Sequence, residues 1–295
     1  MKNLLILSLI FFGMIKIFSL ENKIDKILET TSNQTISVKV MDGSLKIKAW
    51  DKNEVWIKGN FEKNVDKIRF DEQSNNILIK SDIKNNLKNR KNIRVFLEIF
   101  VPKENDINID LINAECEITG VEKNISVTST SGNIKINSNS KDVDIVTING
   151  NVELKGNSNI FQGTSINGNF LINGDCNILK IKTSSGNINL TETLVKNINI
   201  FSTNGEIKIK GLKFDKSNCE IINIRGNILF LIPQEESIQI MIKSISGKVK
   251  INKNDFDEIY KEEKSFKIKK GSGESVVFLE TMIGEIEIIT QINTD

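Results

Sequence analysis

Glycine-centred turns recur at a nearly constant interval through the middle of the chain, and this repeat constrains the fold more than any other feature. The glycines are Gly132, Gly150, Gly168, Gly186, Gly205, Gly226 and Gly247. Successive glycines are 18, 18, 18, 19, 21 and 21 residues apart. Because unrelated turns have no reason to keep one interval, we interpret these glycines as the corners of one repeated unit.

Apolar and polar residues alternate on both sides of each glycine. In the unit of Gly186, Leu179 and Ile181 stand seven and five residues before the glycine, and Ile188 and Leu190 stand two and four after it. Alternation with a period of two is typical of half-buried strands. Each unit is therefore predicted to be two short strands around a tight turn, with the glycine supplying a positive φ and a serine or threonine three residues earlier lying at the inner corner.

One such unit cannot bury its apolar face, whereas stacked units form a continuous core. We therefore predict an all-β fold, a single-stranded β-helix or solenoid-like stack of about 18-residue rungs. Gly43, Gly284 and, in the glycine slot, Ala114 fit the same frame, so Gly43 and Gly284 join the seven turn glycines. A meander of independent hairpins is the alternative, since Asn-Gly is also a strong hairpin signal, but the constant period favours rungs.

Four segments are expected along the chain. Residues 1–19 have Lys2 before an apolar run that is too short to span a bilayer, which takes about 20 residues, and this is typical of a signal peptide cleaved after Ser19. An uncleaved membrane anchor is the alternative. Residues 20–33 are predicted to be a linker, residues 34–102 an irregular β-sheet that caps the stack, and residues 103–290 the repeats, closed by the unit of Gly284. A charged excursion at 254–270 is expected to be a short helix or a hairpin over the open end.

Charge and composition exclude several classes of function. Without residues 1–19 the chain has 38 basic and 38 acidic side chains, whereas a nucleic-acid-binding protein has a basic excess on one face. One local basic run is predicted to be a solvated loop. It consists of Lys84, Lys88, Arg90, Lys91 and Arg94. The chain has no histidine and so lacks the commonest general base and metal ligand.

An enzyme acting on polysaccharides is the main catalytic alternative, because β-helices also carry such sites. It would need carboxylates that converge from neighbouring rungs. The candidates occupy different slots of the repeat, so no catalytic residues are predicted. They are Asp142, Asp144, Glu153, Asp175, Glu192 and Glu206.

The residue after the corner glycine is usually an amide, and carboxylates are rare there. The amides are Asn133, Asn151, Asn169, Asn187 and Asn227. We expect them to hydrogen-bond from rung to rung as an asparagine ladder, and we expect no metal and no cofactor.

The cysteines and tryptophans are predicted to be structural. Cys116 and Cys219 fall at inward positions six rungs apart, and Cys176 is placed in a connecting turn, so three free thiols are expected. Trp50 and Trp56 on the first strands are expected to pack, with a sugar-stacking platform as the alternative.

Three stretches resemble the toastrack family of candidate bacterial adhesins, a β-strand-repeat family of unassigned biochemistry. These stretches are Val38 to Ile57, which contains Trp50-Asp51, Val95 to Lys103, and Gly271 to Ile288. The resemblance covers about residues 34–290. It implies a right-handed stack that is exported or tethered to a membrane, with adhesion or a role in envelope stress.

Together these features predict an exported cell-envelope protein, periplasmic or on the cell surface, that acts as an adhesin or binding scaffold without catalysis. The expected partner is an envelope protein or a polysaccharide, with no nucleic acid and with membrane contact only through an uncleaved N-terminal segment. A polysaccharide-active enzyme and a module that stacks end to end are the alternatives.

Overall fold

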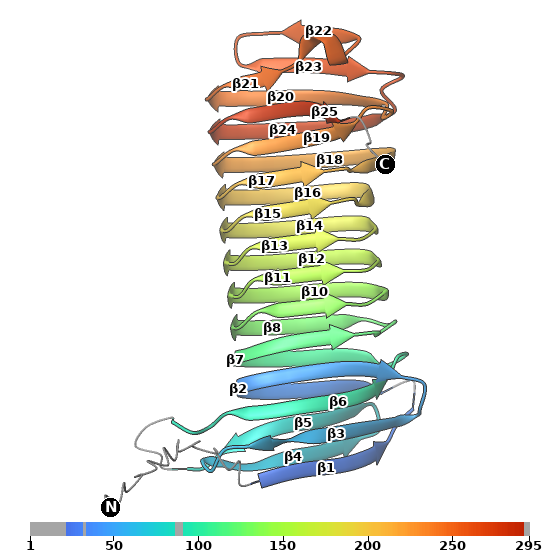
Figure 1. The fold of residues 1–295 in the computed structure, drawn as a ribbon, viewed down its shortest axis with the longest axis vertical. Coiled ribbons are helices and arrows are strands. Elements are labelled where there is room, and N and C mark those ends of the chain that lie inside the picture. Colours follow the sequence, from blue (N-terminus) through green and yellow to red (C-terminus); the bar gives the residue numbers. More distant parts are fainter. Residues whose placement is uncertain (1–21, 32–33, 86–90, 292–295) are drawn as a thin grey trace, which may run out of the picture.

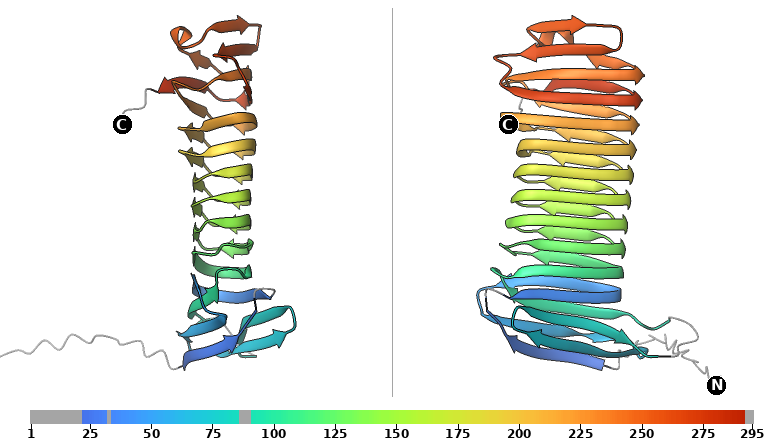
Figure 2. Two further views of the ribbon diagram at one scale, coloured as in Figure 1. Left: turned by 90° about the vertical axis from the view of Figure 1, so that its right-hand side faces the viewer. Right: turned by 180° about the vertical axis from the view of Figure 1, so that it is seen from behind.

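The chain folds into a long stack of strands (Figure 1). This computed structural model describes residues 22–31, 34–85 and 91–291, so the predicted signal segment 1–19 lies outside the described residues. Two sheets face each other along the whole stack, as the side view in Figure 2 shows. The sheets are open, and the buried aliphatic side chains fill the space between them. The predicted all-β stack is confirmed.

Each rung contributes a long strand to one sheet and a short strand to the other. We name these the long-strand sheet and the short-strand sheet. The long strands are β8 (Ile125–Ser131), β10 (Ser140–Asn149), β12 (Ser158–Asn167), β14 (Cys176–Ser185), β16 (Leu194–Asn204), β18 (Lys213–Arg225), β20 (Ile238–Ser246) and β24 (Ser275–Ile283). The short strands are β9 (Ile134–Asn137), β11 (Val152–Lys155), β13 (Phe170–Asn173), β15 (Ile188–Thr191), β17 (Ile207–Lys210), β19 (Ile228–Pro233), β21 (Val249–Ile251) and β25 (Ile286–Gln291).

Neighbouring rungs pair in parallel and in the register that the glycine frame predicts. Thr147 lies opposite Ser129 in one neighbouring rung and opposite Ser165 in the other. Each pair therefore joins residues one period apart, which is the pattern of a solenoid and excludes the meander of hairpins.

The first two rungs are built from long strands that pass through both sheets. These are β2 (Thr35–Trp50) and β7 (Asp106–Thr119), and Gly43 lies opposite Ala114. The N-terminal end of the stack is covered by β1 (Asn22–Glu29), β3 (Glu54–Phe61), β4 (Val65–Gln73), β5 (Asn76–Ile83) and β6 (Val95–Pro102). The prediction of a linker over residues 20–33 is wrong for residues 22–29, because β1 pairs along its whole length with β3.

The order of the last rungs in space differs from their order in the sequence. Strands β24 and β25 lie between the rung of β18 and β19 and the rung of β20 and β21 (Figure 1). The prediction that the unit of Gly284 closes the stack is therefore wrong. The closing element is the excursion, which forms β22 (Glu258–Lys261) and β23 (Ser265–Lys270) after a 3-10 turn at Lys253–Asp255. These two strands form a hairpin whose β23 pairs antiparallel with β20, so the end of the stack is not a bare rung.

The corner glycines are required chiefly because neighbouring rungs approach so closely. A Cβ atom on Gly168 would lie 2.0 Å from the carbonyl oxygen of Gly150, and one on Gly247 would lie 1.7 Å from that of Gly284. The predicted reason, a positive φ, applies at Gly186, whose φ is +152°, but not at Gly168 or Gly247. Rung spacing therefore selects glycine even where the turn does not.

The rung that contains Gly163 packs its core differently from the neighbouring rungs. Gly163 occupies an inward position that is apolar in the neighbouring units, and a Cβ atom there would lie 2.5 Å from the ring of Phe170. Phe170 and Phe161 are fully buried, with ring centroids 6.5 Å apart in an edge-to-face arrangement. The missing side chain at Gly163 thus provides the space for a phenylalanine from the opposite sheet.

Candidate functional site

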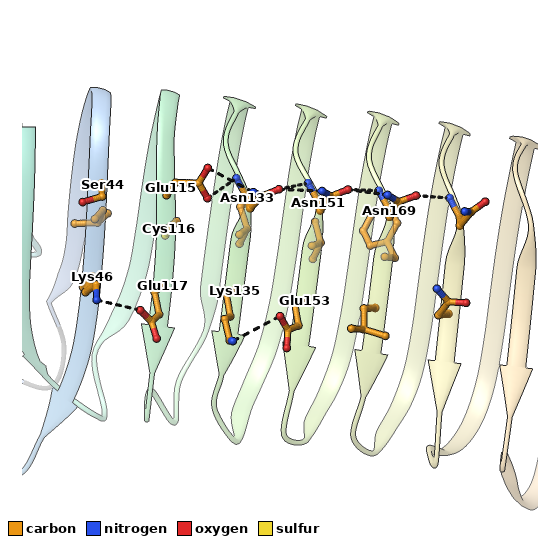
Figure 3. A pocket seen from close by; sticks show the side chains of 17 residues that line it. Ser44, Lys46, Glu115, Cys116, Glu117, Asn133, Lys135, Asn151, Glu153 and Asn169 are labelled. Carbon is orange, nitrogen blue, oxygen red and sulfur yellow. Dashed lines mark hydrogen bonds and ion pairs between the residues drawn. The ribbon is translucent and has the colours of Figure 1, made fainter. Parts of the chain in front are cut away.

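A groove of about 670 Å³ runs across the first rungs of the short-strand sheet (Figure 3). It crosses β2, β7, β9, β11, β13 and β15, which is about 24 Å at about 4.8 Å per strand. We call it the short-strand groove. It is lined by Ser44, Lys46, Glu115, Glu117, Asn133, Lys135, Asn151, Glu153, Asn169, Leu171, Asn187 and Asn189, together with parts of Leu45, Cys116, Ile134, Val152 and Phe170. Its length and the regular spacing of its strands suit an extended molecule.

The predicted asparagine ladder is confirmed and forms one wall of the groove. The side-chain oxygen of Asn151 accepts hydrogen bonds from the backbone N–H of Asn169 at 3.1 Å and from its amide nitrogen at 2.9 Å. The Asn151 amide nitrogen in turn donates to the side-chain oxygen of Asn133 at 3.0 Å (Figure 3). At the ends of this ladder, the carboxylate of Glu115 accepts from the N–H of Asn133, and the N–H of Glu206 donates to Asn187.

A line of alternating charges crosses the floor of the groove. Lys46 lies 3.5 Å from Glu117, and Lys135 lies 3.7 Å from Glu153. A second lysine, Lys155, lies 3.0 Å from Glu153, and hydrogen bonding to Lys155 lowers the pKa of that carboxyl. Leu171 and Asn189 continue the line without charge on the next two rungs. The groove therefore offers neutral amides and balanced ion pairs.

The acidic residues considered for catalysis do not come together. Asp142 and Asp144 lie on β10 of the long-strand sheet, whereas Glu153 lies in the groove on β11 of the other sheet. Asp175, Glu192 and Glu206 lie at other positions. The carboxylate of Asp175 accepts the N–H of Leu194, Glu192 has a φ of 51°, and Glu206 ends the asparagine ladder.

Two groove carboxylates, Glu115 and Glu117, were not among the sequence candidates. They lie on β7, one residue and three residues after Ala114, which occupies the glycine slot of that unit. Glu117 lies opposite Lys46 on one neighbouring strand and opposite Lys135 on the other. Comparing the outward positions of the short strands in register could have identified it.

The two tryptophans form an aromatic cluster at the N-terminal end of the short-strand sheet. The ring centroids of Trp50 and Trp56 each lie 5.4 Å from that of Phe100 and 6.0 Å from each other. The ammonium of Lys58 lies 3.2 Å from the Trp56 ring centroid, and the Trp56 indole N–H donates to Asp25 at 2.7 Å. The rings are half-buried against one another, as expected for packing.

The three cysteines are free and buried, which confirms the predicted thiols. The predicted position of Cys176 is wrong. This residue begins β14 and is 3% exposed, instead of lying in a connecting turn. Burial raises the pKa of Cys116 and that of Cys219 to about 12, so neither thiol is a nucleophile near neutral pH.

Other sites were sought over the part of the chain that the structure describes. No group of three or more histidine, cysteine, aspartate or glutamate side chains there is arranged to hold a metal ion. Within the same ranges, none of the helical segments has the length and apolarity needed to cross a membrane. Of the basic run, Lys88 and Arg90 lie outside the described residues, and Arg94 lies 3.5 Å from Glu62.

The sequence matches the profile of one protein family over residues 25–289, which is nearly all of the repeat and its N-terminal cap. The chain belongs to the Toastrack DUF4097 family. The match begins within β1, at residue 25, in agreement with the place of this strand in the cap. No curated protein matches the sequence of this Toastrack protein.

Several solved structures are similar to this Toastrack chain over most of their length. A putative adhesin from Bacteroides fragilis NCTC 9343 is 14% identical and aligns over 91% of this chain and 98% of its own, with a TM-score of 0.48. A putative lipid binding protein from Parabacteroides distasonis ATCC 8503 is 15% identical over 92% and 96% of the two chains, with a TM-score of 0.39. A putative cell adhesion protein from Clostridium sporogenes ATCC 15579 is 14% identical over 92% and 100%, with a TM-score of 0.26.

Proposed function

We propose that this Toastrack protein is a non-catalytic adhesin of the cell envelope that holds a linear polysaccharide along the short-strand groove. The observation that carries the proposal is the asparagine ladder beside the charge-paired floor, in a groove that crosses six neighbouring strands. The side-chain oxygens of Asn133 and Asn151 each accept two hydrogen bonds within the ladder, so these amides offer a polymer the second hydrogen of their nitrogens. Such a row of donors suits a polymer that presents hydroxyl or N-acetyl oxygens at regular intervals.

Binding without catalysis is supported by the state of the groove carboxylates. A glycosidase needs one carboxyl that keeps its proton at neutral pH, and such groups are found where burial raises the pKa. Glu153 is in the opposite situation, because hydrogen bonding to Lys155 lowers its pKa. Glu117 is also paired with a lysine, since Lys46 lies 3.5 Å from its carboxylate.

Export is supported by the sequence of residues 1–19, which has the pattern of a signal peptide. A rigid stack in which each rung is hydrogen-bonded to the next would hold the groove straight outside the cell. We place the protein on the cell surface, where an adhesin must act.

The binding proposal is tested with an array of purified linear polysaccharides probed with the labelled protein and two matched variants. Asn189→Arg puts a long charged side chain into the groove on β15, whereas Asn177→Arg makes the same change on β14, on the other sheet. We expect wild type and Asn177→Arg to bind the same polymers and Asn189→Arg to lose binding at least tenfold. Equal loss in both variants, or binding to none of the polymers, would contradict the proposal.

Two further measurements separate the alternatives. Incubating a bound polymer with the protein and assaying new reducing or unsaturated ends tests for catalysis, and release of such ends that Glu153→Gln abolishes would favour the enzyme. Fractionation combined with protease treatment of intact cells tests location. A protein found only in the periplasm would overturn the adhesin.

A further inference from the structure

The short-strand groove changes in character along its length. Its first strands carry ion pairs, such as that of Lys135 with Glu153 (Figure 3). The next two strands, β13 and β15, place the uncharged side chains of Leu171 and Asn189 in the same line. The groove therefore has a charged end beside the N-terminal cap and a neutral end on β13 and β15.

The charged end favours a neutral polymer. The groove is lined by two lysines and three glutamates, and the lysines are paired, since Lys46 lies 3.5 Å from Glu117 and Lys135 lies 3.7 Å from Glu153. The third acid, Glu115, accepts the N–H of a ladder asparagine. An anionic polymer would face three glutamates, and a cationic one would face two lysines whose partners are already engaged. The choice among neutral sugars then depends on the other end of the groove.

Leu171 and Asn189 lie side by side at the neutral end, because they pair in register on neighbouring strands. Of the described residues that line the groove, Leu171 is the one apolar residue with an exposed side chain, at 43% exposure. The side-chain amide of Asn189 has no hydrogen-bond partner among the described residues. An apolar surface therefore lies directly beside an unpaired amide.

Asn187 adds a second amide to the same end. It stands just before β15, two residues from Asn189, so the two residues are about 7 Å apart at about 3.3 Å per residue. The side-chain oxygen of Asn187 accepts the N–H of Glu206 at 2.8 Å, whereas its amide nitrogen donates to no group among the described residues. Asn187 thus offers a free donor, and Asn189 offers a free acceptor beside Leu171.

We propose that Leu171, Asn187 and Asn189 form a subsite for the acetamido group of an N-acetylated sugar in the bound polymer. We call it the acetamido subsite, and it rests on the proposed binding of a polysaccharide in the groove. An acetamido group is a planar trans amide, so its methyl lies on the same side of the C–N bond as its N–H, and its carbonyl oxygen lies on the other side. Asn189 accepts from the N–H while the methyl packs against Leu171, and Asn187 donates to the carbonyl oxygen.

The same arrangement disfavours the two common substitutes for an acetamido group. A hydroxyl has no methyl to cover Leu171, and it is too small to reach the amides of Asn187 and Asn189 together. A free amine carries a positive charge, and Lys208, which has no ion-pair partner among the described residues, lies opposite Asn189 on the next strand. We therefore expect the groove to select N-acetylated sugars over both.

Calorimetric titration with three oligosaccharides of equal length tests the subsite. All three have a backbone of β-1,4-linked glucose and differ only in the substituent on the second carbon, which is acetamido, hydroxyl or amino. We expect the wild type to bind the acetamido oligomer at least tenfold more tightly than either of the others. Leu171→Ser should reduce this preference to less than threefold with an unchanged melting temperature. The matched control is Leu229→Ser, three residues after a corner glycine on β19 and outside the groove, which should keep the preference.

The outcomes separate the subsite from the groove. Equal affinity of the wild type for the acetamido and hydroxyl oligomers, or a preference that Leu171→Ser retains, would overturn the acetamido subsite. If Asn189→Arg abolished the equal binding, the groove would stand without the subsite. Binding of none of the three oligomers would also overturn the subsite, and the groove itself would fall only if the polysaccharide array were negative as well.

Saturation-transfer NMR on the acetamido oligomer supplies a second measurement. Irradiation of the protein methyl resonances should transfer more saturation to the acetyl methyl protons than to the sugar ring protons, because the methyl packs against Leu171. Leu171→Ser should reduce the transfer to the acetyl methyl at least twofold, and Leu229→Ser should not. Stronger transfer to the ring protons, or transfer that Leu171→Ser leaves unchanged, would overturn the assigned contact.

Discussion

Replacing Gly168 by alanine tests how strictly the spacing between rungs is set. The new Cβ atom would lie 2.0 Å from the carbonyl oxygen of Gly150 and 2.6 Å from the hydroxyl oxygen of Ser165, whereas ordinary contacts are 3.4–4 Å. The two rungs must therefore separate at this corner by more than 1 Å, because the oxygen belongs to backbone that cannot turn aside. Nearby rung-to-rung bonds, such as the N–H of Val152 to the oxygen of Asn169 at 2.8 Å, would lengthen or break.

We expect Gly168→Ala to lower the free energy of unfolding by about 3 kcal/mol or more. Overpacking costs about 1–3 kcal/mol, and each hydrogen bond lost adds about 1 kcal/mol. Urea denaturation followed by circular dichroism measures the change. The matched control is Gly211→Ala, whose φ is +67° but whose Cβ atom would find its nearest neighbour at 3.5 Å, so only the conformational cost of about 1–2 kcal/mol applies. If Gly168→Ala proved no more costly than Gly211→Ala, close approach of the rungs would not be the reason for glycine at the corners.

Four further predictions address the core, its thiols and the order of the rungs. Thr183→Val should raise the free energy of unfolding by about 1 kcal/mol, and with it the urea midpoint, because the buried hydroxyl of Thr183 has no hydrogen-bond partner among the described residues. A loss of stability would show that the hydroxyl is satisfied. Ellman's reagent should find no reactive thiol in the native protein and three in denaturant. Because burial raises the pKa of Cys116 and Cys219 to about 12, stability owed to these thiols should be constant below about pH 9 and should fall as the pH rises from 9 towards 12; a rise in that window would contradict the burial. Leu229→Cys with Glu287→Cys should form an intramolecular disulfide, because β19 and β25 are neighbours, whereas Leu229→Cys with Lys250→Cys should not; the reverse result on a non-reducing gel would restore the sequential order of rungs.

The register of the stack could be predicted from the sequence because one residue type marks each corner. Once the glycines are aligned, strand alternation fixes which residues face the core, and the pairing of Gly43 with Ala114 follows from the same frame. The asparagine ladder could be predicted for the same reason, since one slot of each unit carries an amide.

The order of the last rungs could not be predicted in this way. Parallel pairing of aliphatic strands is equally favourable for either neighbour, so nothing in the unit of Gly284 distinguishes an inserted rung from a closing one. Strand β1 was missed because its alternation is masked by charged residues in Asn22–Glu29, and its partner β3 is distant in sequence. The exchange of Gly163 for space filled by Phe170 joins residues on opposite sheets, which a pattern within one strand does not show.

Part of the candidate site could have been predicted from the sequence. The charge line of the groove depends on outward positions: Glu153 was considered for catalysis, but its in-register neighbour Lys135 and the next residue in the line, Glu117, were not compared with it. Comparing the outward positions in register would also have found the exposed apolar residues Ile148 and Ile166 on β10 and β12. What the sequence could not supply is the ion pairing itself, because it depends on which side chains lean towards each other across the rungs.

The most direct test of the central claim, that the short-strand groove binds a linear polysaccharide, is calorimetric titration with oligosaccharides of increasing length from the polymer that binds best. The groove crosses six strands, so affinity should rise with each added sugar until the oligomer fills about 24 Å and should then stay constant. Asn189→Arg should abolish this dependence on length and Asn177→Arg should preserve it. Affinity that does not depend on length, or that survives in Asn189→Arg, would contradict binding along the groove.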